Sequence, residues 1–310
     1  MREIVDKIYP RFRMAADVLT EHYRVKGQGT TNALRPEGIL LGRTFWLDLA
    51  YWDKDGERLV DGEILRVLDC DFSSLMTSIV EKVRKRFEWS AQKVSDGLWK
   101  CELGQPELAF PFVFTGAFNG LELESEPVVM CSDLKTLLVA GINDESALQR
   151  MAKEAETICL SGSVGSFVPV TRSEENRSWE MFHAERRFDS LQIFRRLRLE
   201  ECSEHYRRQK EALSVLADET NVAEFFVRTT EDTLRSYCEF VEGKDALLPG
   251  VDRVILRPKT YSEFDGLEIG MRDLLFYLQG AMEPQGMVPE RYLARAFPSV
   301  KQLVRLGQVH

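Results

Sequence analysis

The segment from Glu185 to Asp218 constrains the fold of this chain more than any other part of the sequence. No Gly or Pro lies between Arg186 and Ala217, and Leu, Arg, Glu, Gln and Lys, which are good helix formers, fill this interior. The sequence therefore predicts one long, nearly uninterrupted helix. At 1.5 Å per residue it would be roughly 45 Å long, which is enough to cross a whole domain.

One stripe of this helix collects most of its apolar side chains and is expected to be buried. The members of the stripe are Phe188, Leu191, Cys202, Tyr206, Leu213 and Leu216, with Phe194 and Leu199 at its edges. The same stripe contains Arg195, Arg198 and Gln209, and buried polar groups need hydrogen-bond partners. Either the helix bends near Arg196, or the arginine stems cover the core while their charged ends reach water.

A second interpretation of these arginines is that they line a cleft. Arg195 and Arg198 would then hold a carboxylate, on the protein or on a ligand, in the geometry that guanidinium groups favour. Inside the chain, the carboxylates expected to face the helix are Asp252, Glu224 and Glu239. If these carboxylates already pair with the arginines, the contact is structural.

Short strand and helix signals fill the rest of the chain. Apolar residues from Ile4 to Leu19 recur at helical spacing, so we predict a helix there that is kinked or restarted at Pro10. The stretch 39–52 reads as one or two strands, and 53–56 (DKDG) turns the chain into a partner strand. After the long helix, three strands at 222–228, 234–241 and 251–257 predict an antiparallel meander. The expected fold class is α+β, with short, mostly antiparallel sheets packed with helices.

The length of 310 residues allows two domains, and the polar run 172–178 is the best candidate for their boundary. We expect an N-terminal α+β domain over residues 1–172. A C-terminal α+β domain, built on the long helix, is expected over residues 173–310.

Composition limits the partners and the compartment. The formal net charge of -9 disfavours a protein that binds nucleic acid without sequence preference, because that function rests on a basic surface. No apolar run approaches 18 residues, and the first 20 residues lack the apolar run of a signal peptide, so no membrane partner is expected. Six cysteines without a CxxC pair fit a reduced compartment. We therefore expect a soluble, cytoplasmic protein.

No catalytic motif stands out. None of the four histidines has a paired metal-ligand spacing, and no cysteine or serine lies in a recognisable nucleophile motif. The sequence thus predicts no catalytic residue, metal or cofactor. Tyr206 and Gln209 lie one helical turn apart and are able to reach a common neighbour, which for a buried Tyr and Gln is most simply a loop backbone.

Several separated segments carry a resemblance to a known family. They are WEMF at 179, HYRRQKEAL at 205, VAEFFV at 222, SYCEFVEGKDALLPGVDRVIL at 236 and PERYLARAFP at 289. Their order resembles a bacterial family catalogued as domain of unknown function 1444, over about residues 179–298. The resemblance implies a bacterial, cytoplasmic, α+β protein. It supplies no activity and no catalytic residues, and it leaves the first 120 residues unmatched.

Two functional hypotheses follow. The favoured one is a non-catalytic binding or scaffold protein that self-associates or docks an unknown protein partner, since its titratable groups are scattered. The alternative is a hydrolase-like enzyme or a protein that binds a small anionic ligand, with a cleft between the long helix and the C-terminal sheet. The residues expected to line that cleft are Arg195, Arg198, Tyr206, Gln209 and Asp252.

Overall fold

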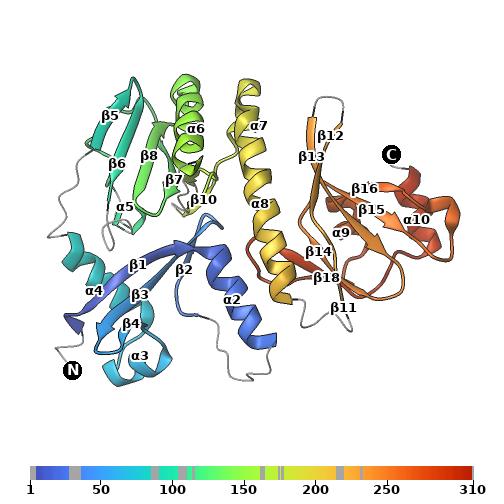
Figure 1. The fold of residues 1–310 in the computed structure, drawn as a ribbon, viewed down its shortest axis with the longest axis horizontal. Helices are drawn as coiled ribbons and strands as arrows, with labels where there is room; N and C mark the ends of the chain where they lie inside the picture. Colours follow the sequence, from blue (N-terminus) through green and yellow to red (C-terminus); the bar gives the residue numbers. More distant parts are fainter. Residues whose placement is uncertain are drawn as a thin grey trace. The chain divides into compact units, whose positions relative to one another are not determined.

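The computed structural model combines helices with four separate sheets, which confirms the predicted α+β class. It describes residues 5–27, 36–84, 91–103, 110–113, 116–160, 165–173, 175, 178–213, 220–230 and 233–308, and Figure 1 traces them. The chain forms two compact units, one made of Met1–Val18 with Arg35–Arg198 and the other of Leu19–Leu34 with Leu199–His310. The boundary between the two units lies between Arg198 and Leu199, inside the long helix, whereas the predicted domain boundary lies between residues 172 and 173.

The first unit contains two sheets, which we name A and B. Sheet A consists of β1 (Ile8–Met14), β2 (Ile39–Leu41), β3 (Phe45–Asp53) and β4 (Gly56–Leu59). β1 pairs along one side of β3, while β2 and β4 pair with its other side, all antiparallel. In sequence, α2 (Ala15–Gly27) lies between β1 and β2, α3 (Gly62–Leu68) and α4 (Phe72–Arg84) follow β4, and α5 (Phe110–Val113) comes later in the chain.

Sheet B is six-stranded and has apolar residues on both faces. In spatial order its strands are β10 (Trp179–Met181), β9 (Val170–Arg172), β7 (Pro127–Asp133), β8 (Thr136–Gly141), β6 (Leu98–Glu102) and β5 (Ala91–Ser95). One face shares a core with sheet A, and the other packs on α6 (Glu145–Leu160), which lies along β7 and β8 (Figure 1). Because both faces of β7 and β8 are covered, these strands read as continuous apolar runs rather than alternating ones.

The N-terminal segment is a strand where the sequence predicted a helix. Along β1, buried and half-buried residues alternate, with Ile8 and Phe12 in the core. The apolar residues up to Met14 that suggested a helix are the buried positions of this strand, and α2 begins only at Ala15. Pro10 is tolerated because, among the described strands, β1 is at the edge of sheet A and pairs with β3 alone, so the missing N–H does not interrupt the sheet.

The long helix is shorter than predicted. A short helix, α7 (Ala184–Arg187), comes first, then a 3₁₀ turn over Asp189–Leu191, and α8 runs over Gln192–Leu213. The break is at Phe188, whose backbone is extended (φ -136°, ψ 119°). Leu191, Tyr206 and Leu213 are buried as predicted and Phe188 is half-buried, while Leu216 lies outside the described residues.

The second unit contains sheets C and D, whose strands do not follow one another as a plain meander. Sheet C has the order β11 (Thr220–Val222), β14 (Asp245–Pro249), β18 (Arg291–Ala294) and β17 (Met282–Pro284). Sheet D has the order β12 (Phe226–Thr230), β13 (Thr233–Val241), β15 (Arg253–Arg257) and β16 (Glu268–Gly270). β13 and β15 run parallel because β14, between them in sequence, joins the other sheet, where it also runs parallel to β11. A 3₁₀ turn (Ser262–Phe264), α9 (Met271–Tyr277) and α10 (Val300–Gln308) complete this unit.

Candidate functional site: the outer face of sheet A

Sheet A has one face in the core of its unit and a second face that carries charged and aromatic side chains. Directly paired residues of antiparallel strands share a face, so the strand register defines this second face, which we call the outer face. Its members are Tyr9, Arg11 and Arg13 of β1, Leu40 of β2, Trp46, Asp48, Ala50 and Trp52 of β3, and Glu57 and Leu59 of β4.

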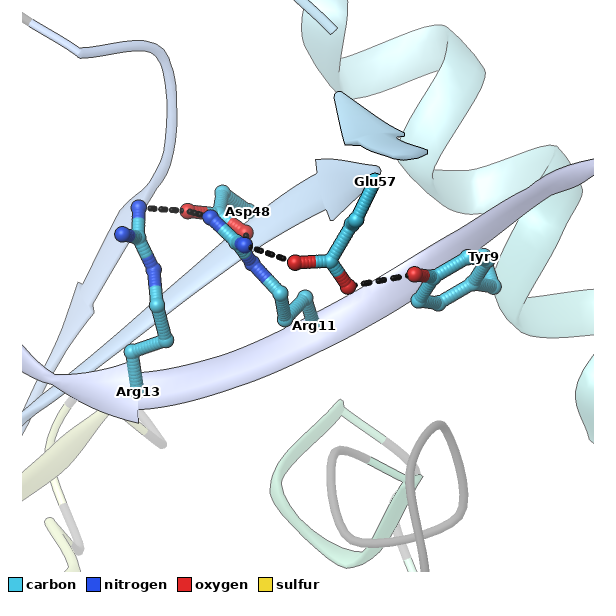
Figure 2. A network of polar contacts seen from close by, with 5 residues as sticks. All are labelled: Tyr9, Arg11, Arg13, Asp48 and Glu57. Carbon is cyan, nitrogen blue, oxygen red and sulfur yellow. Dashed lines mark hydrogen bonds and ion pairs between the residues drawn. The ribbon is translucent and has the colours of Figure 1, made fainter. Parts of the chain in front are cut away.

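A chain of alternating charges runs along β1 on the outer face (Figure 2). Arg13 Nη2 contacts Asp48 Oδ2, and Arg11 donates from Nε to Asp48 Oδ1 at 3.1 Å. Arg11 also donates to Glu57 Oε2 through Nη1, and the Tyr9 hydroxyl donates to Glu57 Oε1. Asp48 is buried although it is charged, because two guanidinium groups lie over it.

The ionisation of these groups follows from their contacts. Burial, together with the hydrogen bond to Glu57, raises the pKa of Tyr9 to about 12. Burial alone would raise the pKa of Glu57, but the hydrogen bonds from Tyr9 and Arg11 outweigh it and hold that pKa below its ordinary value. Burial lowers the pKa of Arg13, and the charge of Asp48 opposes this only in part. At neutral pH Glu57 is therefore ionised and the Tyr9 phenol is neutral.

The outer face also presents apolar groups to solvent. Trp52 is 61% exposed, and Leu40 and Leu59 are 36% and 39% exposed. A cavity of about 370 Å³ adjoins Leu40 and Trp46 and is also lined by Pro36, Glu37 and Gly38. Trp46 Nε1 and Arg13 Nε are both buried, and neither has a hydrogen-bond acceptor among the residues that the structure describes. These two donors are therefore covered rather than available at the surface.

The structure places the residues predicted from the sequence in separate locations. Arg198 contacts the carboxylate of Glu185, and the two side chains are 18% and 4% exposed. The partners proposed from the sequence are engaged elsewhere: Asp252 with Ser236, Glu224 with Lys210, and Glu239 with Arg257. This pairing is not predictable from the sequence, because no Gly or Pro marks the break at Phe188 that takes Glu185 out of the regular helix. Arg195 is half-buried on the same helix.

His183 adds a second basic group beside Glu185. Its Nδ1 lies 3.5 Å from Glu185 Oε1, which is too long for a good hydrogen bond. Burial opposes the ionisation of Glu185, but the neighbouring His183 and the charge of Arg198 outweigh it and lower the pKa of the carboxyl group. Arg198 thus has a carboxylate partner other than the three expected from the sequence, and ligand binding by this arginine stays a prediction.

Tyr206 and Gln209 do reach a common neighbour, as predicted. Gln209 Oε1 accepts a hydrogen bond from Arg291 Nε at 2.9 Å, and the Arg291 guanidinium lies 5.0 Å from the centre of the Tyr206 ring. Gln209 Nε2 donates to the Pro289 carbonyl, and the Tyr206 hydroxyl donates to the Glu290 carbonyl at 2.8 Å. The segments YRRQ and PERY, which carried the family resemblance, are therefore in direct contact.

Asp252 takes part in a different local contact. Its Oδ2 accepts hydrogen bonds from both N and Oγ of Ser236, each at 2.8 Å, and its own backbone N–H donates to Ser236 Oγ. This contact joins β13 to the residue that precedes β15. The five predicted site residues therefore do not form a single constellation in the contacts that the structure describes.

Comparison with protein-family models, curated proteins and solved structures gives no match for this chain. Across the residues that the structure describes, no helix has the length and apolar character needed to cross a membrane. Within the same ranges, no three His, Cys, Asp or Glu side chains gather closely enough to hold a metal ion. The geometry of the outer face is therefore the main basis for a functional proposal.

The sequence contained a signal for the outer face that was assigned to the wrong element. In the segment IYPRFRM, Tyr9, Arg11 and Arg13 occur at every second position, which is the period of a strand with one polar face. The apolar residues of the same segment also fit a helix that continues to Leu19, and the greater length of this match favours a helix over a strand. Asp48, by contrast, gives little sign of its role, because it is one charge inside an apolar strand.

Proposed function

We propose that this chain is a non-catalytic binding protein that docks a partner protein through the outer face of sheet A. The observation that carries the proposal is the cavity of about 370 Å³ on a face that also exposes Leu40, Trp52 and Leu59. Protein interfaces concentrate their energy in a few apolar anchors that fill such pockets. We expect an apolar side chain of the partner to enter the cavity beside Leu40 and Trp46.

The types of residue on this face support the proposal. Trp, Tyr and Arg are the residues most often responsible for binding energy at interfaces. Here the ion pairs with Asp48 and Glu57 already hold Arg11 and Arg13 in place, so little side-chain entropy is lost on binding. The β strands that carry these side chains provide a rigid platform.

Charge suggests what kind of partner surface fits. The two arginines of the network are balanced by two carboxylates, so the centre of the face is close to neutral. A second copy of the same face would bring arginines and carboxylates that are already paired with one another. We therefore propose a different protein with a protruding apolar side chain, and we take self-association as an outcome of the test. A bacterial cytoplasmic location, expected from the sequence, is part of this proposal.

The experiment begins by identifying the partner and then measures its affinity. A photo-crosslinking amino acid in place of Leu59, in cells that make the protein, should capture one partner, whereas the same substitution at Phe276 should not. Phe276 is the matched control because it is 66% exposed and lies in the other unit. The purified partner should bind Trp52→Ala at least about tenfold more weakly than wild type, as expected for loss of an aromatic anchor, and Phe276→Ala unchanged.

Three results would contradict the proposal. One is equal affinity of the partner for wild type and Trp52→Ala. Another is capture of the same proteins from Leu59 and Phe276. The third is capture of a second copy of this chain only, together with a monomer–dimer equilibrium that Trp52→Ala shifts in sedimentation velocity, since that would assign the face to self-association.

A further inference from the structure

A second cavity, in the other unit, gathers basic side chains from separate segments of an acidic chain. It has a volume of about 400 Å³ and is lined in part by Lys210 of α8, Thr220 and Val222 of β11, Val241 of β13, Lys244 of the turn before β14, and Lys259 after β15. The chain carries a formal net charge of -9, so three lysines among the residues that line one cavity run against its overall composition. Positive charges close together repel one another, and an anion bound between them offsets this repulsion because each ammonium group attracts it.

Glu242, the acidic residue among the described lining residues, offsets part of this positive charge, since the charge of Lys259 helps to lower the pKa of its carboxyl group. Glu242 Oε2 accepts hydrogen bonds from the backbone N–H groups of Lys259, at 2.6 Å, and of Thr260, at 3.1 Å. These two bonds lower the pKa of Glu242 and fix its carboxylate on the backbone. Lys210 contacts Glu224, which is 74% exposed, so solvent screens that pair.

The backbone at Gly243 makes room for one of the ammonium groups. Gly243 has φ +114°, a conformation that other residues rarely adopt, and a Cβ there would lie 2.9 Å from Lys259 Nζ. Glycine therefore allows the Lys259 side chain to lie across the turn that also carries Lys244. The two lysines are 15 positions apart in sequence, and both line this cavity.

We propose that this cavity binds a small organic phosphate. Lysine ammonium groups act as point charges that suit a phosphate dianion, whereas carboxylates are held best by the planar fork of arginine. A volume of about 400 Å³ lies in the range of small-molecule sites, so it has space for more than the phosphate group. Val222 and Val241 offer apolar contacts to the organic part, and the Thr220 hydroxyl is able to donate a hydrogen bond.

The inferred site is independent of partner docking, because it lies in a different unit and uses no residue of the outer face. It also differs from the anion site expected from the sequence. Both involve the long helix and the strands that follow it, but the expected residues were Arg195, Arg198, Tyr206, Gln209 and Asp252. The cavity instead uses lysines near the end of α8 and in the strand connections.

The test is to titrate the protein with each ligand at constant ionic strength. Binding is measured by calorimetry, and the melting temperature by thermal denaturation. Ribose 5-phosphate should bind wild type and raise its melting temperature, inorganic phosphate should bind more weakly, and ribose should have no effect. The double variant Lys244→Ala/Lys259→Ala should bind ribose 5-phosphate at least about tenfold more weakly, in line with the loss of two charge-assisted contacts. Lys153→Ala/Lys301→Ala, which removes the same charge from exposed positions, should bind as wild type does.

A second variant keeps the proposal testable if the double variant does not fold. Thr220→Glu adds a negative charge at the cavity without removing a lysine, and it should abolish phosphate binding. Unchanged binding by a folded Lys244→Ala/Lys259→Ala or by Thr220→Glu would overturn the proposal. So would equal loss in the Lys153→Ala/Lys301→Ala control, binding of ribose alone, or binding of citrate as tight as that of ribose 5-phosphate.

Discussion

Arg291 has an unusual environment for a charged residue, because its side chain is 0% exposed and its acceptors are carbonyl oxygens. Besides Gln209 Oε1, it donates to the backbone oxygens of Tyr206, Ala223 and Leu247 at 3.0 to 3.1 Å. Burial lowers its pKa to about 10, so the guanidinium stays charged at neutral pH. One side chain thus joins α8, β14, β18 and the residue after β11.

Replacing Arg291 should therefore weaken the second unit. Arg291→Met removes the donor for four buried acceptors, and we expect a loss of roughly 2 to 4 kcal/mol in the free energy of unfolding. Arg295→Met is the control, because Arg295 is 54% exposed and its ion pair with Glu283 is also exposed. Urea denaturation of the three proteins checks this, and equal midpoints for wild type and Arg291→Met would show that the contacts contribute little.

Arg198 allows a sharper choice between structure and ligand binding. Arg198→Ala leaves Glu185 without its closest partner at a nearly buried position, so we expect a loss of about 2 kcal/mol or more. Arg208→Ala, which breaks an exposed pair with Glu204 on the same helix, should cost under about 1 kcal/mol. If the role is structural, sulfate should raise the melting temperature of wild type and Arg198→Ala equally. A larger shift for wild type would favour the anion cleft predicted from the sequence.

Residues on one helix face could be predicted, but their partners could not. The phase of the long helix indicated that Tyr206, Gln209 and Arg198 need hydrogen-bond partners, and each has one. Arg291 is about 80 positions away from Gln209, and Glu185 is separated from Arg198 by a backbone break. Contacts of this kind depend on how elements pack, and a helical stripe carries no information about that.

At the scale of elements, the end of α8 offers a direct test of packing. Leu213 belongs to a small core with Val222, Leu247 and Met287. Leu213→Ala should cost roughly 2 to 5 kcal/mol, because it removes buried methyl groups and leaves a cavity. Glu211→Ala, at an exposed position of the same turn, should change the unfolding free energy by less than about 0.5 kcal/mol. A denaturation midpoint unchanged by Leu213→Ala would contradict the packing of this helix.

The elements also show where local sequence signals suffice. The hairpin of β3 and β4 follows from a β-rich stretch and the turn DKDG, and both lie where the sequence predicted. β1 is not predictable in this way, because its apolar residues match a helix and a strand equally well over seven positions. Its pairing with β3 makes it a strand. β14 was missed because DALLP is short and ends in proline, although its ladder to β18 shows a regular strand.

For the whole molecule, the α+β class could be predicted because it depends on the mixture of periodicities, whereas the topology depends on long-range pairing. The parallel pairs β11–β14 and β13–β15 arise from strands that are not neighbours in sequence. The same limit applies to both candidate sites. The outer face of sheet A draws on residues 9–59 and the phosphate cavity on residues 210–259, and neither set forms a motif that is readable along the chain.

The cysteines test the expected compartment on the whole chain. Cys70, Cys101, Cys131, Cys202 and Cys238 form no disulfide among the described residues, while the side chain of Cys159 lies outside them. Burial raises the pKa of Cys101 and of Cys238 to about 12, which keeps both protonated and unreactive in the folded protein. A thiol reagent at neutral pH should therefore react with fewer groups in the native protein than in the denatured one. In denaturant without reductant it should count all six cysteines of the sequence. A count of four or fewer would mean that a disulfide forms, and it would argue against the reduced compartment expected from the sequence.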